Sequence, residues 1–179
     1  MYLKYTTGDG RQYAAGDGSV LVFNRFGMIL DRTETDVIRW RSLRNKGWGT
    51  MGEEERQEWL SPMKGSYNYT DLNRVESAVE YVAEQLRYHG YYVLPVVKKD
   101  WTMHDSPTIY DMNRYFSNVA ELRSKIKVYD TTPEAPTTAK KLDYTMANAL
   151  EQILVDISEL LKKLSEVWFY SGDLYCGEV

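Results

Sequence analysis

YTDLNRVESAVEYVAEQL, residues 69–86, is the stretch that decides the fold. Its apolar residues Leu72, Val75, Val79, Val82 and Leu86 are spaced three, four, three and four residues apart. That heptad spacing places one apolar stripe along a helix. Two later stretches repeat it, at Met112, Tyr115, Val119, Leu122 and Ile126, and at Ala147, Leu150, Leu154, Ile157, Leu161, Leu164 and Trp168. The sequence therefore predicts a mainly α protein with three heptad-patterned helices in a bundle.

The connections and the earlier residues complete this predicted bundle. Residues 89–107 and 129–143 are loops that would join antiparallel helices. Two shorter helices are predicted before the bundle, each begun by a capping box. Thr33 with Asp36 would start the first, and Thr50 with Glu53 would start the second, which ends near Leu60.

Residues 1–26 have a different character and are predicted to form a small β segment. Three short strand candidates, residues 2–6, 11–15 and 19–24, are separated by two Gly-Asp-Gly turns. An isolated ribbon of this size is marginally stable in water. We therefore divide the chain into a β segment, residues 1–26, that anchors the protein to a partner, and a helical domain, residues 33–179.

Two helix starts nearly repeat each other in sequence. Asp71, Asn73 and Arg74 in the first correspond to Asp111, Asn113 and Arg114 in the second. Threonine and asparagine side chains satisfy the free amides at a helix start. We interpret the following residues as structural helix starts: Thr70, Asn73, Arg74, Asp111, Asn113, Arg114, Thr145 and Asn148. The alternative is that the Asn-Arg pairs converge on a bound anion or sugar.

Composition excludes several classes of protein. A length of 179 residues suggests one ordinary domain, and a net charge of −4 argues against a general nucleic-acid binder. No apolar run is long enough to span a membrane, and the first residues lack the apolar core of a signal peptide. We therefore expect synthesis in the cytoplasm without export by a signal peptide.

The residues needed for catalysis or metal binding are scarce. The chain has one cysteine, Cys176, and two histidines, His89 and His104, which lie apart in the sequence. No nucleophile motif, phosphate-binding loop or calcium loop is present. We predict no catalytic residue, no cofactor and no metal site.

Aromatic residues are abundant, with fifteen tyrosines and five tryptophans. Such side chains are enriched at interfaces because they combine an apolar body with a polar tip. The candidate interaction residues are Tyr2, Tyr5, Tyr13, Tyr91, Tyr92, Trp101, Trp168, Tyr170 and Tyr175. Trp101 and Met103 could instead close the end of the bundle, and the C-terminal aromatic residues could fold back onto it.

Five longer runs carry a resemblance to a known group of proteins. They are GWGTMGEEERQEWL, MKGSYNYTDLNRVESAVEYV, DWTMHDSPTIYDMNRYFSNVAELR, TTPEAPTTAKKLDYTMANALEQIL and WFYSGDLYCGE. In wording and order they resemble minor structural, tail-associated proteins of phages and prophages of Firmicutes, over residues 33–179. The resemblance implies a helical module of the phage particle and supplies no catalytic residues. Residues 1–26 lie outside it.

The expected function is therefore that of a virion structural protein, in the tail or baseplate, acting as an assembly module. Its expected partners are other phage structural proteins and further copies of itself. One alternative is a module that binds host-surface glycans by stacking sugars on Trp101, Tyr91, Tyr92 and Trp168. The second alternative is a small cell-wall hydrolase.

Overall fold

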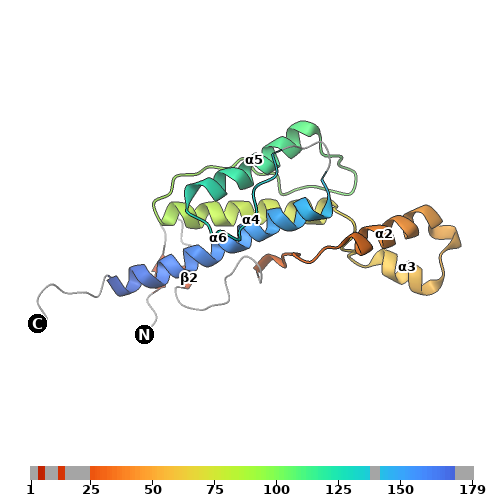
Figure 1. Ribbon diagram of the computed structural model, residues 1–179, viewed down its shortest axis with the longest axis horizontal. Helices are drawn as coiled ribbons and strands as arrows, with labels where there is room; N and C mark the ends of the chain where they lie inside the picture. The colour runs from red at the N-terminus through yellow and green to blue at the C-terminus, as the bar shows by residue number, and fades with distance from the viewer. Residues whose placement is uncertain (1–3, 7–11, 15–24, 138–141, 172–179) are drawn as a thin grey trace, which may run out of the picture.

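The computed structural model describes residues 4–6, 12–14, 25–137 and 142–171 of the chain. In this part the protein is mainly helical, with five α-helices. Their bounds are Glu34–Lys46 (α2), Glu53–Leu60 (α3), Tyr69–Tyr88 (α4), Ile109–Lys125 (α5) and Tyr144–Ser171 (α6). A single 3₁₀ turn, η1 (Trp48–Thr50), links α2 to α3. Helices α4, α5 and α6 form the bundle, and α2 and α3 form a hairpin at one end of it (Figure 1).

Most of the apolar stripe residues predicted from the sequence lie in the bundle core, but Leu164 of α6 is 39% exposed. Val75, Val82 and Leu86 of α4 are fully buried, as are Leu150 and Leu154 of α6. Burying one such side chain contributes roughly 1.5–3 kcal/mol relative to leaving it exposed. The heptad stripes therefore account for the fold class, and the prediction of a helical bundle is confirmed.

The three long helices run in the same direction, so the prediction of antiparallel packing was wrong. Near the start of both helices, Arg74 of α4 binds Glu151 of α6 at 2.9 Å. Near their ends, the Ser165 hydroxyl of α6 lies 3.0 Å from His89, which follows α4. Helix α5 has the same direction, because Arg114 near its start pairs with Glu76 in the first half of α4 (Figure 1).

Long extended links allow this parallel arrangement. Helix α4 has 20 residues and is therefore about 30 Å long. An extended chain of equal length can span roughly 66 Å, because it rises about 3.3 Å per residue. The segment between Tyr88 and Ile109 can thus return along the whole bundle without forming a helix of its own. An extended link of this length can therefore join parallel helices as well as antiparallel ones.

Two asparagines hold extended segments to the helices. The Asn73 side chain accepts from the Trp101 amide and donates to the Trp101 carbonyl, both at 2.9 Å. Asn148 does the same for Arg32, at 3.2 Å and 2.9 Å. Each asparagine side chain thus makes two hydrogen bonds to the backbone of one residue, as a neighbouring β-strand would. These bonds satisfy backbone N–H and C=O groups that would otherwise be costly to bury.

The helix starts differ in part from the sequence-based prediction. Thr33 and Asp36 form the predicted capping box.

The other predicted threonine caps were wrong, because a different residue caps the first turn of each helix. Thr50 lies in η1, and Glu55 accepts from the Gly52 amide to start α3. Thr70 and Thr145 lie inside their helices, whose first turns are capped by Asn68 and Asp143. Asp71 and Asp111, by contrast, each complete a capping box as the third helical residue.

The N-terminal segment is described only over two three-residue strands, β1 (Lys4–Thr6) and β2 (Gln12–Ala14). They pair antiparallel, with Tyr5 opposite Tyr13. The remaining residues of the predicted β segment, including the third strand candidate, lie outside the described residues. The role of residues 1–26 as an anchor stays a prediction. In the described ranges, none of the helices is both long and apolar enough to cross a membrane.

Candidate functional site

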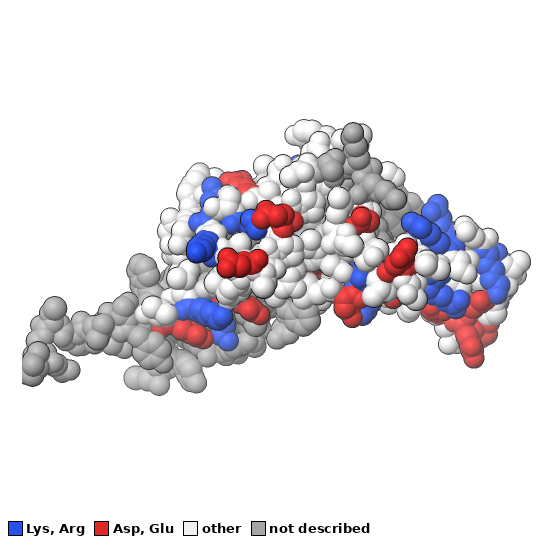
Figure 2. All heavy atoms as spheres, in the orientation of Figure 1, with Lys and Arg blue, Asp and Glu red and all other residues white. Residues whose placement is uncertain are grey.

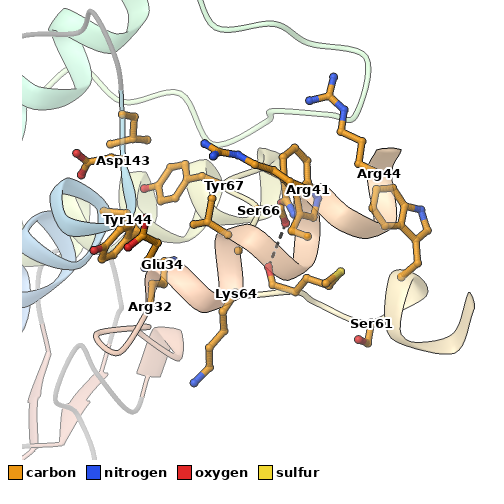
Figure 3. Close-up of a pocket in the computed structure, with 18 residues that line it drawn as sticks. Arg32, Glu34, Arg41, Arg44, Ser61, Lys64, Ser66, Tyr67, Asp143 and Tyr144 are labelled. Carbon is orange, nitrogen blue, oxygen red and sulfur yellow. Dashed lines mark hydrogen bonds between the residues drawn. The ribbon is translucent and has the colours of Figure 1, made fainter. Parts of the chain in front are cut away.

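A cleft of about 840 Å³ lies between the α2–α3 hairpin and the bundle (Figure 3). One wall comes from α2 and carries Trp40, Arg41 and Arg44. The opposite wall comes from the start of α6 and carries Asp143 and Tyr144. The segment that joins α3 to α4 completes it with Trp59, Ser61, Met63, Lys64, Gly65, Ser66, Tyr67 and Asn68. The cleft therefore combines four aromatic rings with several charged groups.

The residues of α2 that line the cleft all lie on one face of this helix. Glu34, Val37, Trp40, Arg41 and Arg44 line the cleft, and they recur every three or four residues. Residues at that spacing share one face of a helix. Trp40, on this face, is half-buried and lines the cleft.

A close backbone approach sets the position of the hairpin. A Cβ atom on Gly65 would lie 2.0 Å from the Asp36 carbonyl oxygen and 2.4 Å from its carbonyl carbon. No side chain fits there, so only glycine lets the segment before α4 pass directly against α2. The Lys64 ammonium, beside this glycine, binds Asp31 at 2.5 Å across the same junction.

The charges around α2 are not all neutralised in the same way. On the side of α2 facing α3, Arg39 pairs with Glu58 and Lys46 pairs with Glu55. Arg41 and Arg44 form no ion pair with a carboxylate among the described residues, and the Arg44 guanidinium lies 5.3 Å from the centre of the Trp40 ring. The cleft therefore has two arginines that remain available to an acidic ligand.

A largely buried ion cluster lies next to the cleft. It consists of Arg32, which also lines the cleft, and of Asp71, Arg74 and Glu151. Arg32 Nη2 lies 3.0 Å from Asp71 and 2.7 Å from Glu151. Arg74 Nη2 reaches the same two carboxylates at 2.5 Å and 2.9 Å. Glu151 is completely buried and also accepts from the Ile29 amide. Two positive and two negative charges thus compensate each other inside the protein.

The surroundings of Arg74 in the cluster favour its charged form. Burial by itself lowers the pKa of Arg74, but the hydrogen bond and charge of Glu151, together with Asp71, outweigh burial and raise it. Nearby, the hydroxyl groups of Tyr67 and Tyr115 are hydrogen-bonded to each other. Burial raises the pKa of both tyrosines well above the ordinary value, so both stay neutral. These groups hold the helices and the segment before α2 together.

The predicted helix-start residues mostly act as links between segments. Arg114 binds Glu76 and the Val96 carbonyl, and the hydrogen bond to Glu76 raises its pKa. Arg74 and Arg114 therefore each reach a carboxylate of the bundle, but they belong to separate ion pairs. Asn113 is exposed. The α5 side chain that holds the link between α4 and α5 is Asn118, which donates to the Val96 carbonyl. The repeated Asp-x-Asn-Arg stretch thus combines a helix start at the aspartate with a tertiary link at the arginine.

The predicted interaction residues fall into three groups. Trp101 is only 5% exposed and belongs to the core, with the Lys98 ammonium 3.9 Å from its ring centre. It provides no exposed platform for a sugar, so this part of the glycan hypothesis was wrong. Tyr91 packs against the core, whereas Tyr92 is exposed. The side chains of Tyr5, Tyr13, Trp168 and Tyr170, and the whole of Tyr2 and Tyr175, lie outside the described residues.

The cleft residues were missed by sequence reasoning because they come from separated segments. The one local signal was the spacing of Val37, Trp40 and Arg44 on one short helix.

In the described part of the chain, no three His, Cys, Asp or Glu side chains are grouped as metal ligands would be. The arrangement can bind a ligand through aromatic faces and guanidinium groups. Comparisons with protein-family models, curated proteins and solved structures gave no match.

Proposed function

We propose that this protein is a structural component of a phage particle, in the tail or baseplate, and that it acts as an assembly module through protein–protein contacts rather than as an enzyme. The resemblance of residues 33–179 to phage tail-associated proteins supports this proposal. The structural observation that carries it is an apolar ridge on the surface of the bundle.

The apolar ridge consists of Tyr92, Leu94 and Val96. These side chains are 74%, 59% and 69% exposed, whereas Val93 between them is buried. The alternation arises because an extended chain points successive side chains to opposite sides. Ile109, Tyr110 and Met103 are also largely exposed, and Tyr110 lies one helical turn before Arg114, which binds Val96. Contiguous exposed apolar residues of this kind are typical of interaction surfaces.

The ridge is held rigidly before any partner binds. Arg87 donates to the Val93 carbonyl at 2.9 Å, and Asn118 donates to the Val96 carbonyl at 2.8 Å. Because the segment is fixed at both ends, a partner would lose less conformational freedom on binding it. A preorganised apolar surface supports a role in assembly, either with another phage protein or with a second copy of the chain.

Replacing the ridge is expected to reduce self-association without unfolding the protein. We expect the triple variant Y92S/L94S/V96S to shift towards the monomer in light scattering, because it removes the three exposed apolar side chains of the ridge. Exposed substitutions usually change stability by only about 0.5 kcal/mol each. The matched control is I38S/L60S, which changes two exposed apolar residues on the hairpin. A monomeric wild-type protein, or equal association of both variants, would contradict a homo-oligomer built on the ridge.

The particle itself provides the test of the proposed location. We expect mass spectrometry of purified virions to detect this chain in several copies in the tail fraction. A chain lacking residues 1–26 is expected to keep the helical circular-dichroism signal and to be lost from particles, since those residues are the predicted anchor. Absence of the full chain from purified particles would refute the virion role, and incorporation of the shortened chain would refute the anchor.

A further inference from the structure

The cleft and the far end of α6 lie at opposite ends of the molecule (Figure 1). Tyr144, at the start of α6, lines the cleft, and α6 then continues to Ser171. A helix of 28 residues is about 40 Å long. The eight residues after Ser171 reach at most roughly 29 Å when fully extended. Residues 172–179 therefore cannot enter the cleft of their own chain.

The chemistry of residues 172–179 is nevertheless complementary to that of the cleft. The segment GDLYCGEV has two carboxylates, Asp173 and Glu178, and no lysine or arginine. Its apolar and aromatic side chains include Leu174 and Tyr175. The cleft offers two arginines without a carboxylate partner among the described residues, Arg41 and Arg44, beside apolar and aromatic groups that include Val37, Trp40 and Trp59.

We propose that the cleft of one copy binds residues 172–179 of a second copy. Arg41 and Arg44 would bind the carboxylates, and the rings of Trp40 and Trp59 would contact Leu174 and Tyr175. The lining also holds two carboxylates, Glu34 and Asp143. Asp143 is occupied at the start of α6, where it accepts from the Met146 amide. Basic side chains gather over the α2–α3 hairpin (Figure 2). On the rim of α2, Arg41 and Arg44 outnumber Glu34, so an incoming segment meets a net positive charge there.

Such a contact joins different surfaces of the two copies. Two copies that exchange these segments form a twofold dimer, whereas a contact that repeats in one direction produces a closed ring or an open filament. The apolar ridge is separate from the cleft, because none of its residues lines it. The inference goes beyond the proposed function, since assembly in a particle does not require it.

A charge-exchange experiment tests the inference. The probe is a fluorescein-labelled peptide with the sequence of residues 172–179, and its anisotropy is followed as full-length protein is added. We expect saturable binding in the sub-millimolar range, weakened at least ten-fold by R41E/R44E. A peptide carrying D173K/E178K is expected to bind R41E/R44E more tightly than it binds the wild-type protein. This reciprocal change requires direct pairing of the two sets of charges.

A second double variant tests whether the loss of peptide binding comes from Arg41 and Arg44 themselves or from the change in the net charge of the protein. Lys127 and Lys162 are exposed and lie away from the cleft, so K127E/K162E changes the net charge equally. We expect this control to bind the wild-type peptide as the wild-type protein does. The inference is overturned if the peptide does not bind the wild-type protein, if both double variants lose binding equally, or if the exchanged peptide fails to prefer R41E/R44E. Detection of the chain in virions is independent of all these outcomes.

Discussion

Replacing Glu151 with alanine is expected to destabilise the protein by about 3–5 kcal/mol, the usual effect of removing one partner from a buried ion cluster. Glu151 has no exposed surface and binds two arginines, Arg32 and Arg74, as well as the Ile29 amide. Without it, two buried guanidinium groups share the single charge of Asp71. The measurement is the free energy of unfolding from urea denaturation, with the slope of the transition compared between variants.

The control is the exposed ion pair between Glu80 and Lys99. Its side chains are 42% and 44% exposed, so E80A is expected to cost only about 0–1 kcal/mol. The two substitutions remove the same type of side chain from neighbouring helices of one bundle, and they differ mainly in burial. A loss below about 1 kcal/mol for E151A would show that the buried ion cluster does not hold the helices together.

Replacing Trp101 with alanine is expected to cost a further large part of the stability, about 3–5 kcal/mol. Trp101 lies in an extended link, yet its ring is buried in the core between the helices. Its removal leaves a cavity that the surrounding helices cannot fill, since Asn73 fixes the backbone at this residue. Thermal unfolding and urea denaturation would both measure the effect.

Trp48 provides the matched control because it is the same residue type and is 50% exposed. W48A is expected to change the stability by about 1 kcal/mol or less, mainly through loss of the contact with Arg56. Equal stability of W101A and the wild type would contradict the buried position of Trp101. If W101A unfolds, loss of glycan binding in that variant carries no information about sugar stacking, and Y92A is the appropriate variant for that question.

Much of the fold could be predicted from local pattern. The stripes of α4, α5 and α6 identified the bundle helices because an apolar spacing of three and four residues is a property of a single helix. Helix starts were less certain, since several good capping residues stand within a few positions of each other. Asn68 and Thr70 both suit that role, and only the path of the incoming chain places Asn68 at the first turn of α4.

The candidate site could not be predicted in the same way. The link between Asn148 and Arg32 joins residues 116 positions apart, and that between Asn73 and Trp101 joins residues 28 apart. A single asparagine beside an apolar stripe gives no information about which backbone it will bind. The cleft arises in the same manner, because its walls come from α2, the segment before α4 and the start of α6.

The sequence by itself determined that three helices would each bury one stripe and that residues 89–107 would be non-helical. Tertiary structure decided the common direction of the helices, the burial of Trp101 and the exposure of Leu94 and Val96. The physical reason is the distance along the chain over which each feature is determined. Helical periodicity depends on residues within one or two turns, whereas direction and burial depend on which distant segments share the limited space around the core.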